Sequence, residues 1–320
     1  MRRRDVIALL GAAAAAWPRA TRAAAAKIAR VGIIDDAPQW EPFRQQLREL
    51  NYVEGKNIVF EYRRADGVLE RLDEAARELA RLPVEVIVTY GTPAAQAAQR
   101  ATETVPIVII GVGDPVGVGL VTNFARPGDN ITGNSILSAD VASKRLQILK
   151  DAIPSVSRIA LLWNPDNASN IAILQETQKA APLFHMTLAL IQARTPDDFN
   201  SVFAQMSSDR PDALLTTNDP LLQSQMSRVI DFLLNNRIAG MFQLRQNVAD
   251  GGLMAYAASV PDLFRRGATY VDKILRGTKP GDLPIEQPLT FELIVNLKTA
   301  KAVGVEFPQN LLARADEVIE

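Results

Sequence analysis

Short apolar runs alternate with amphipathic stretches along residues 29–110. Runs of β-branched and aliphatic residues favour buried strands, and the apolar positions between them recur at helical spacing, as Phe43, Leu47 and Leu50 do. Such an alternation is typical of a parallel sheet covered by helices on both faces. It predicts strand 29–34, helix 40–51, strand 57–62, helix 69–81, strand 84–89, helix 93–102 and strand 105–110.

The same alternation starts again near residue 158. No sequence repeat of fixed period relates the second half to the first, so the similarity is one of architecture. The pattern therefore predicts an α/β chain with two Rossmann-like lobes that contain parallel sheets. The elements expected in the second half are strand 158–163, helix 169–183, strand 186–191, helix 197–207, strand 213–216, helix 221–235 and strand 238–242.

Three stretches rich in turn residues are expected to pass between the lobes: residues 129–135, 250–259 and 283–289. A chain that crosses three times forms a three-stranded hinge, which permits closure around a ligand. The expected division gives residues 27–133 and 257–284 to the first lobe, and residues 134–256 and 285–320 to the second.

The first 26 residues have the pattern of a signal peptide: a basic start, an apolar centre and small residues at the end. Arg3 and Arg4, followed by one free position and two apolar residues, also fit the twin-arginine form. The apolar run at residues 6–17 is shorter than the roughly 20 residues that span a membrane. We expect export, cleavage and a periplasmic protein that is not inserted in the membrane.

Composition removes several kinds of chemistry. The chain has no cysteine, which excludes disulfides, thiolate metal sites and cysteine nucleophiles. Its one histidine, His185, precedes a predicted strand and is expected to be structural. The glycine-rich residues 111–117 lack the lysine of a P-loop and the spacing of a dinucleotide fingerprint, and no G-x-S-x-G elbow occurs. We therefore expect no cofactor and no metal, while a glycosidase-like carboxylate pair stays open. The net charge of −1 does not suggest nucleic acid as a partner.

Ligands of parallel α/β sheets sit outside the carboxyl ends of the strands, where this chain has the segment VTYGTPAAQAA. Thr92 is predicted to cap a helix, and Pro93 suits its first turn. The amides of Ala94 and Ala95 would then point outward at the positive end of the helix dipole, and Gly91 would let a ligand approach. Such a terminus can hold a carboxylate or phosphate. An ordinary capped helix is the alternative.

The second lobe has a polar loop at residues 164–170, directly after Trp163. Its asparagines can donate and accept hydrogen bonds, or can simply form a turn. Asp114 or Asp219 could pair with an ammonium group, or be only a cap or turn residue. The aromatic candidates could stack on a flat ligand or pack in the core. The candidate ligand-binding residues are Asp35, Tyr90, Gly91, Thr92, Pro93, Ala94, Asp114, Trp163, Asn164, Asn167, Asn218, Asp219, Phe242 and Tyr256.

From Lys27 onward, segments such as NYVEGKNIVFEYR, PIVIIGVGDPV, ALLWNPDN and FELIVNLKTAKAVG together resemble one family. It is the ABC-transporter solute-binding family that includes tryptophan-binding-like proteins, with the type 1 periplasmic-binding fold. The resemblance implies two hinged lobes that trap a small solute and deliver it to a membrane permease driven by an ATPase. Some members bind aromatic amino acids. The resemblance places a carboxylate-cradling loop and a facing loop at Gly91, Thr92, Pro93, Ala94, Asn164 and Asn167.

These observations favour a monomeric, exported receptor of an ABC importer. Its expected ligand is a small organic solute, such as an aromatic amino acid or an aromatic carboxylate, bound between the lobes. An exported α/β hydrolase is one alternative, and turnover of a solute would identify it. A sensor subunit that reports to a membrane receptor is another.

Overall fold

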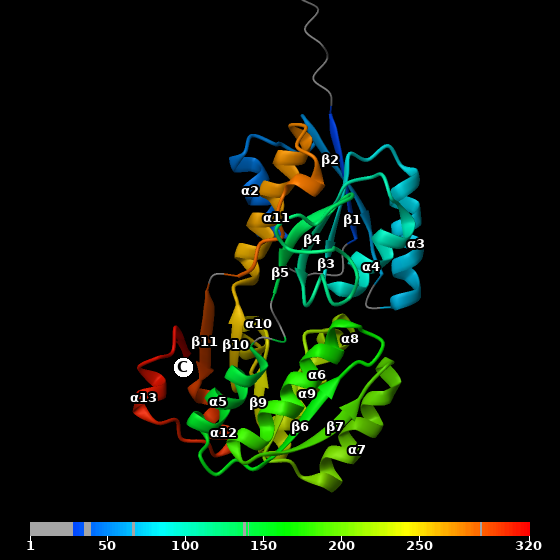
Figure 1. The fold of residues 1–320 in the computed structure, drawn as a ribbon. Helices are drawn as coiled ribbons and strands as arrows, with labels where there is room; N and C mark the ends of the chain where they lie inside the picture. The colour runs from blue at the N-terminus through cyan, green and yellow to red at the C-terminus, as the bar shows by residue number, and fades with distance from the viewer. Residues whose placement is uncertain (1–27, 35–39, 66–67, 137–138, 140, 289) are drawn as a thin grey trace, which may run out of the picture.

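The computed structural model describes residues 28–34, 40–65, 68–136, 139, 141–288 and 290–320. The predicted leader and Asp35 lie outside these residues. The described chain forms two lobes, each built on one sheet (Figure 1). The strand order is β2-β1-β3-β4-β5 in the first sheet and β12-β11-β10-β9-β8-β6-β7 in the second. No helix among the described residues is both long enough and apolar enough to cross a membrane.

The strands of the first lobe pair in parallel throughout, because a helix or a long connection returns the chain after each one. Apolar side chains of α2 and α11 cover one face of the sheet, and those of α3 and α4 cover the other. The predicted order of elements is confirmed. The elements are β1 (Ala29–Ile34), α2 (Glu41–Glu49), β2 (Ile58–Arg63), α3 (Leu69–Arg81), β3 (Val86–Tyr90), α4 (Thr92–Ala101), β4 (Ile107–Val112), β5 (Ile131–Ser135) and α11 (Val260–Leu275).

The second lobe repeats this design with more strands and two apolar clusters, one on each face of its sheet. Its elements are α5 (Ala142–Ala152), β6 (Arg158–Trp163), α6 (Ser169–Ala180), η1 (Ala181–Phe184), β7 (Thr187–Gln192), η2 (Pro196–Asp198), α7 (Phe199–Asp209), β8 (Ala213–Thr216), α8 (Pro220–Ser224), α9 (Met226–Asn236), β9 (Ala239–Phe242), α10 (Arg245–Ala249), β10 (Met254–Ala258), β11 (Phe291–Asn296), α12 (Leu297–Val303), α13 (Gln309–Leu312) and β12 (Glu317–Ile319).

Three details differ from the sequence-based expectation. Strand β11 is antiparallel to β10, because the chain re-enters the second sheet from the first lobe and runs back along its neighbour. The helix predicted over residues 221–235 is two helices, α8 and α9, separated at Gln225. The helix predicted over residues 169–183 ends at Ala180 and continues as η1. His185 follows η1 in a left-handed conformation and lies exposed just before β7, at the amino edge where it was expected.

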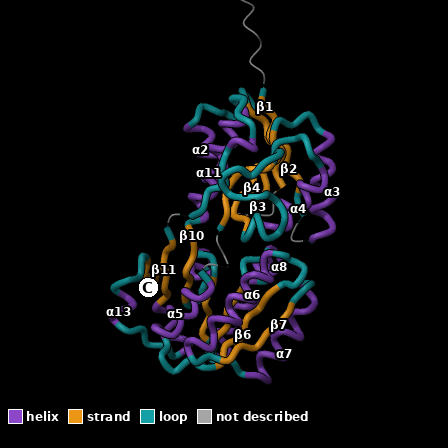
Figure 2. Tube along the Cα trace, in the orientation of Figure 1, coloured by secondary structure: helices purple, strands orange, loops and turns teal. Residues whose placement is uncertain are grey.

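The chain passes between the lobes after β5, after β10 and before β11 (Figure 2). The first and third passages run side by side, because Ser135 N–H donates to the Glu286 carbonyl at 2.8 Å and Glu286 N–H donates to the Gly133 carbonyl at 3.0 Å. Arg266 on α11 also donates to the Glu286 carboxylate at 2.5 Å. The lobe boundaries at residues 133, 256 and 284 remain a prediction. Strand β5 of the first sheet continues to residue 135, and strand β10 of the second continues to residue 258, each two residues past the expected boundary.

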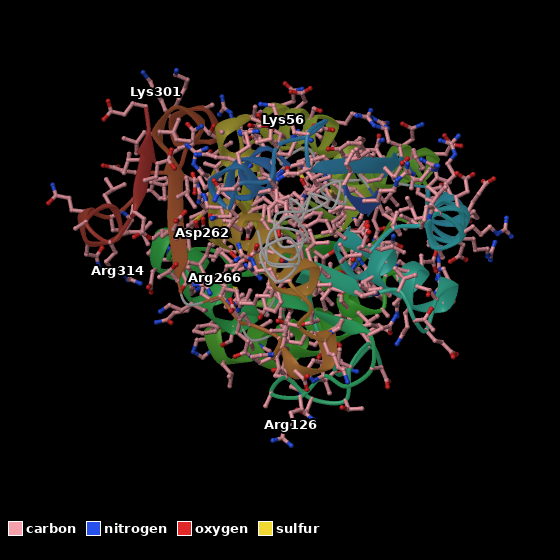
Figure 3. The ribbon with its side chains drawn as sticks, turned by 90° about the horizontal axis from the view of Figure 1, so that it is seen from above. Lys56, Arg126, Asp262, Arg266, Lys301 and Arg314 are labelled. Carbon is pink, nitrogen blue, oxygen red and sulfur yellow. The ribbon has the colours of Figure 1, made fainter. Side chains whose placement is uncertain are left out.

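Charged side chains lie mainly around the outside of the molecule. Viewed from above, Arg126 and Arg314 project from its edge, whereas Asp262 and Arg266 lie closer to its centre (Figure 3). Asp262 pairs with Arg265 at 2.5 Å, three residues further along α11. Among the described residues, no group of three or more His, Cys, Asp or Glu side chains could hold a metal ion.

Candidate functional site

The predicted site residues lie at strand ends on both sides of the lobe boundary. Tyr90 ends β3 in the first lobe, and Asn218 follows β8 in the second. The Asn218 side chain interacts with the Tyr90 hydroxyl, so the carboxyl ends of the two sheets meet here (Figure 1). Leu244, which follows β9, packs against the apolar cluster of the first lobe and adds a second contact across the boundary.

The start of α4 differs from the prediction in one respect. Gly91 occupies the cap position with φ 78°, and the helix begins at Thr92, so the prediction that Thr92 is the cap was wrong. Glycine adopts this positive φ without steric cost, which is why it takes the cap position. The Thr92 hydroxyl instead accepts weakly from Gly113 N–H at 3.4 Å. Ala95 N–H donates to the Gly91 carbonyl at 3.3 Å and is therefore not open to a ligand.

The first turn of α4 keeps two open donors. Within the described part of the chain, the N–H groups of Thr92 and Ala94 have no acceptor. Pro93 has no N–H, and at this position of a helix an N–H would have no partner within the helix, so proline costs the turn no hydrogen bond. Both open N–H groups belong to residues that are almost fully buried, and both lie at the positive end of the helix dipole. The arrangement suits an anionic group held by two backbone amides.

Aromatic rings lie beside this helix terminus. Tyr90 is half-buried, and its ring centroid lies 5.3 Å from that of Phe264 on α11. Trp40 meets Phe264 edge-on at 5.0 Å and is buried. Burial raises the pKa of the Tyr90 hydroxyl, while its interaction with Asn218 acts in the opposite direction. Trp40 and Phe264 were not among the predicted residues, because Trp40 was expected only to begin an amphipathic helix and no element was predicted around Phe264.

Asn164 and Asn167 hold a buried carboxylate. The Asn167 side-chain amide donates to the Asp219 carboxylate at 2.9 Å, and that of Asn164 lies 3.3 Å from the same oxygen. Asp219 is 1% exposed and caps α8 by accepting from Leu222 N–H at 3.2 Å. Burial raises the pKa of the Asp219 carboxyl, whereas these hydrogen bonds act to lower it. Its oxygens are occupied, so the structure favours the cap role over pairing with an ammonium group.

The other predicted residues have simpler surroundings. Asp114 accepts from Gly117 N–H at 2.8 Å and forms a turn. Phe242 is fully buried in a core cluster of the second lobe. Tyr256 is half-buried and stacks on Phe291, with 5.6 Å between ring centroids. Trp163 is buried at the end of β6. The structure thus gathers Asn164, Asn167 and Asp219 into one cluster, while Asp114 and Phe242 serve their own local structure.

A buried arginine was missed by the sequence analysis. Arg145 on α5 is 4% exposed, and its Nε donates to the Tyr256 carbonyl at 3.0 Å. Burial lowers the pKa of this guanidinium to about 9. The contact joins α5, which follows the first passage between the lobes, to β10, which precedes the second. No sequence signal could have identified it, because an arginine on an amphipathic helix is normally exposed.

One cavity of about 380 Å³ spans the two lobes beside α2 and α10. Because residues of both lobes line it, its shape depends on the angle between them. None of the predicted site residues is among its lining, so it is separate from the α4 terminus. The lining residues are Glu41, Pro42, Leu244, Arg245, Gln246, Ala258, Ser259, Val260, Pro261 and Glu292.

Replacing Asp219 by asparagine is expected to destabilise the protein by roughly 2 kcal/mol or more, because the new NH2 group meets a donor in either orientation: Leu222 N–H on one side, or the amides of Asn164 and Asn167 on the other. Urea unfolding followed by circular dichroism measures the loss. Asp166→Asn is the matched control: this exposed carboxylate pairs with Arg194, and losing such a pair changes stability by less than about 1 kcal/mol. Equal effects of the two substitutions would contradict the buried-cap role of Asp219.

Two hinged α/β lobes whose strand ends meet across a boundary define a class of proteins that enclose a small ligand between their halves. The chain matches the family model of ABC transporter substrate binding proteins over residues 39–319. It belongs to this family. The resemblance noted from the sequence, the fold class and the role of a solute-binding receptor are thereby confirmed.

Three known proteins show the degree of similarity. The chain is 25% identical to a tyrosine-binding protein of Clostridioides difficile (strain R20291), over 82% of this chain and 76% of that one. A crystal structure from Streptococcus pneumoniae in complex with L-Trp superposes with a TM-score of 0.84 at 22% identity. The ligand-free, open structure of a Clostridium difficile substrate-binding protein with adhesive properties superposes with a TM-score of 0.64 at 25% identity. Both superpositions cover 91% of this chain and 99% of the other.

Proposed function

We propose that the chain is an exported receptor that closes around an aromatic amino acid or aromatic carboxylate and delivers it to an ABC permease and its ATPase. The observation that carries the proposal is the start of α4. The open N–H groups of Thr92 and Ala94 lie at the lobe boundary, beside Tyr90 and its partner Asn218 on the other lobe. A solute carboxylate bound there is held by the first lobe and enclosed when the second lobe closes.

Two further observations support an aromatic solute. Tyr90 is half-buried beside the anion-holding helix terminus, with the buried rings of Phe264 and Trp40 packed behind it, and flat solutes stack well on such a ring. The similar proteins include one named as tyrosine-binding and one crystallised with L-Trp.

The relation of the two lobes supports closure as the binding step. This chain superposes better on the L-Trp complex than on the ligand-free, open structure, although the two superpositions cover equal shares of the chains. Tyr90 of the first lobe and Asn218 of the second interact in this arrangement. Because a solute can contact both lobes at once only when they are together, a bound solute favours the closed form.

The family acts outside the cytoplasm, and we propose the periplasm as the location of this chain. The supporting feature is the leader pattern of residues 1–26, which would be cleaved on export. We further propose that the receptor is monomeric and performs no chemistry on its solute. An exported hydrolase, the main alternative, would convert the solute instead of returning it unchanged.

Native mass spectrometry of the protein purified from the periplasm without denaturation tests the proposal. We expect a small molecule to remain bound to the chain, with a mass that identifies an aromatic amino acid or carboxylate. The same molecule should bind again, unaltered, in calorimetry with the stripped protein. A chemically changed product after incubation would identify a hydrolase, and a bound solute without an anionic group would contradict the role of the α4 terminus.

A further inference from the structure

Three side chains form a row across the second sheet, at the ends of β6, β8 and β9. Leu162 pairs with Thr216, and Leu215 pairs with Met241. Trp163 and Thr217 come one position after the first pair, and Thr217 and Gln243 come two positions after the second, so continuing both registers past the strand ends puts the three residues in one row. Thr217 N–H donates to the Leu162 carbonyl at 3.1 Å, which extends the ladder to this row.

The three side chains share one face of the sheet. Trp163 belongs to the same apolar cluster as Leu215 and Met241, which stand two positions before Thr217 and Gln243. Residues two apart on a strand point to the same face. The row also adjoins the lobe boundary, because Asn218 follows directly and meets Tyr90 of the first lobe. It therefore lies at the strand ends where a solute would be enclosed.

Each member of the row has one buried polar atom without a hydrogen-bond partner among the described residues: Trp163 Nε1, Thr217 Oγ1 and Gln243 Oε1. The residues are only 7%, 0% and 3% exposed. A buried polar atom that stays unpaired destabilises the folded protein, so each of these atoms calls for a hydrogen-bond partner. The orientation of the Gln243 amide is fixed, because its Nε2 donates to the Thr216 carbonyl at 2.9 Å and leaves the oxygen open.

Together, the three open atoms favour a group that both donates and accepts hydrogen bonds. The indole Nε1 only donates, the glutamine oxygen only accepts, and the threonine hydroxyl does either. A carboxylate would satisfy Trp163 but oppose the oxygen of Gln243, whereas an ammonium group would satisfy Gln243 but oppose Trp163. A neutral hydroxyl group opposes neither, because it can donate one hydrogen bond and accept others.

We propose that this row, Trp163, Thr217 and Gln243, binds a hydroxyl group of the solute and makes the receptor specific for hydroxyl-bearing solutes. The inference rests on the proposed function, since it requires a solute between the lobes. The solute's anion would then rest on the amides of α4 in the first lobe, and its hydroxyl on the row in the second. A phenol with a carboxylate at its other end has this chemistry.

Calorimetry with two matched pairs of solutes tests the row: L-tyrosine against L-phenylalanine, and 4-hydroxybenzoate against benzoate. We expect the wild-type chain to bind at least one hydroxylated member about tenfold or more tightly than its partner. Thr217→Val removes one hydroxyl at nearly constant shape and should reduce that ratio severalfold. Trp163→Phe removes the indole donor and should act in the same direction.

Thr216→Val is the matched control. Thr216 is also buried with an unpartnered hydroxyl, but it points to the opposite face of the same strand, so its replacement should leave the ratio unchanged. The hydroxyl-binding role of the row would be overturned if the wild type bound both members of each pair equally, or if the two threonine variants had equal effects. The receptor function would stay intact, and buried water would be the occupant of the row. If the wild type binds none of the four solutes, the aromatic-solute proposal fails and the row fails with it.

Discussion

Thr92→Pro is expected to abolish solute binding while the protein remains folded. Proline is well suited to the first position of a helix, and the extended ψ of Gly91, 166°, is compatible with a following proline. The substitution removes the open N–H of Thr92 and puts a ring carbon in the place of its hydrogen. A charge-assisted hydrogen bond contributes about 1.5–3 kcal/mol, and the ring also excludes the anion, so affinity should fall by more than about a hundredfold.

Thr92→Val separates the backbone from the side chain. This variant keeps the N–H and the shape of the residue but loses the hydroxyl, whose only described contact is the 3.4 Å hydrogen bond from Gly113 N–H. Its affinity should stay within about tenfold of the wild type. Calorimetry with the solute found by native mass spectrometry measures both variants, and thermal unfolding shows that both fold. Equal binding by Thr92→Pro and the wild type would refute the anion cradle.

Ala94→Asp tests the same helix terminus less cleanly. Ala94 is 1% exposed, and its side chain belongs to an apolar cluster of the first lobe. A carboxylate at this position would be buried among apolar side chains, so loss of binding could follow from loss of the fold.

The order of helices and strands could be predicted from the sequence because hydrophobic periodicity records which face of each element is buried. The direction of a strand relative to its neighbour does not change this periodicity, so it could not be predicted in the same way. Strand β11 has the same buried pattern as a parallel neighbour would have, and only the path of the chain through the first lobe makes it antiparallel to β10. The division at Gln225 is similarly local, since the apolar spacing of residues 221–235 continues across it.

The candidate site was predictable only as a set of strand ends. The topology of parallel sheets placed Tyr90, Thr92 and Asn218 near one boundary, but it could not show which side chains meet. Asn164 and Asp219 are 55 residues apart and both fit simple caps, so their mutual hydrogen bonding required the packed structure. The choice of Gly91 over Thr92 as the cap depends on one backbone angle that no periodicity encodes.

Unpartnered atoms are the hardest feature to predict. Thr216 and Thr217 are adjacent, identical in chemistry and equally buried, yet they belong to opposite faces of β8. Their difference in function depends on what the neighbouring strands place beside them. A sequence shows that both are threonines at a strand end, whereas the register of β6, β8 and β9 shows that only Thr217 stands in line with Trp163 and Gln243.

The second feature with a large expected effect is Gly133 on β5, where Gly133→Ala should destabilise the protein by about 3 kcal/mol or more. Gly133 has φ 136°, and an added Cβ would lie 2.0 Å from the carbonyl oxygen and 2.7 Å from the nitrogen of Ile109. These are backbone atoms of β4, so relief requires the two strands to separate. The register of β4 against β5 already shifts between Ile109 and Val112, which indicates how closely the backbones approach.

Gly133→Ala should also change how the two lobes are arranged relative to each other. The Gly133 carbonyl accepts from Glu286 N–H, so the first and third passages would be disturbed together. Gly119→Ala is the matched control. Gly119 also has a positive φ, 74°, but no described atom lies within 4 Å of its added Cβ, and the strain alone costs about 1 kcal/mol. Urea unfolding measures both losses, and small-angle scattering at low urea compares the lobe arrangement. A Gly133→Ala protein that is no less stable than Gly119→Ala would show that β5 can move away from β4 without cost, and the passage would then be a loose tether instead of a fixed part of the hinge.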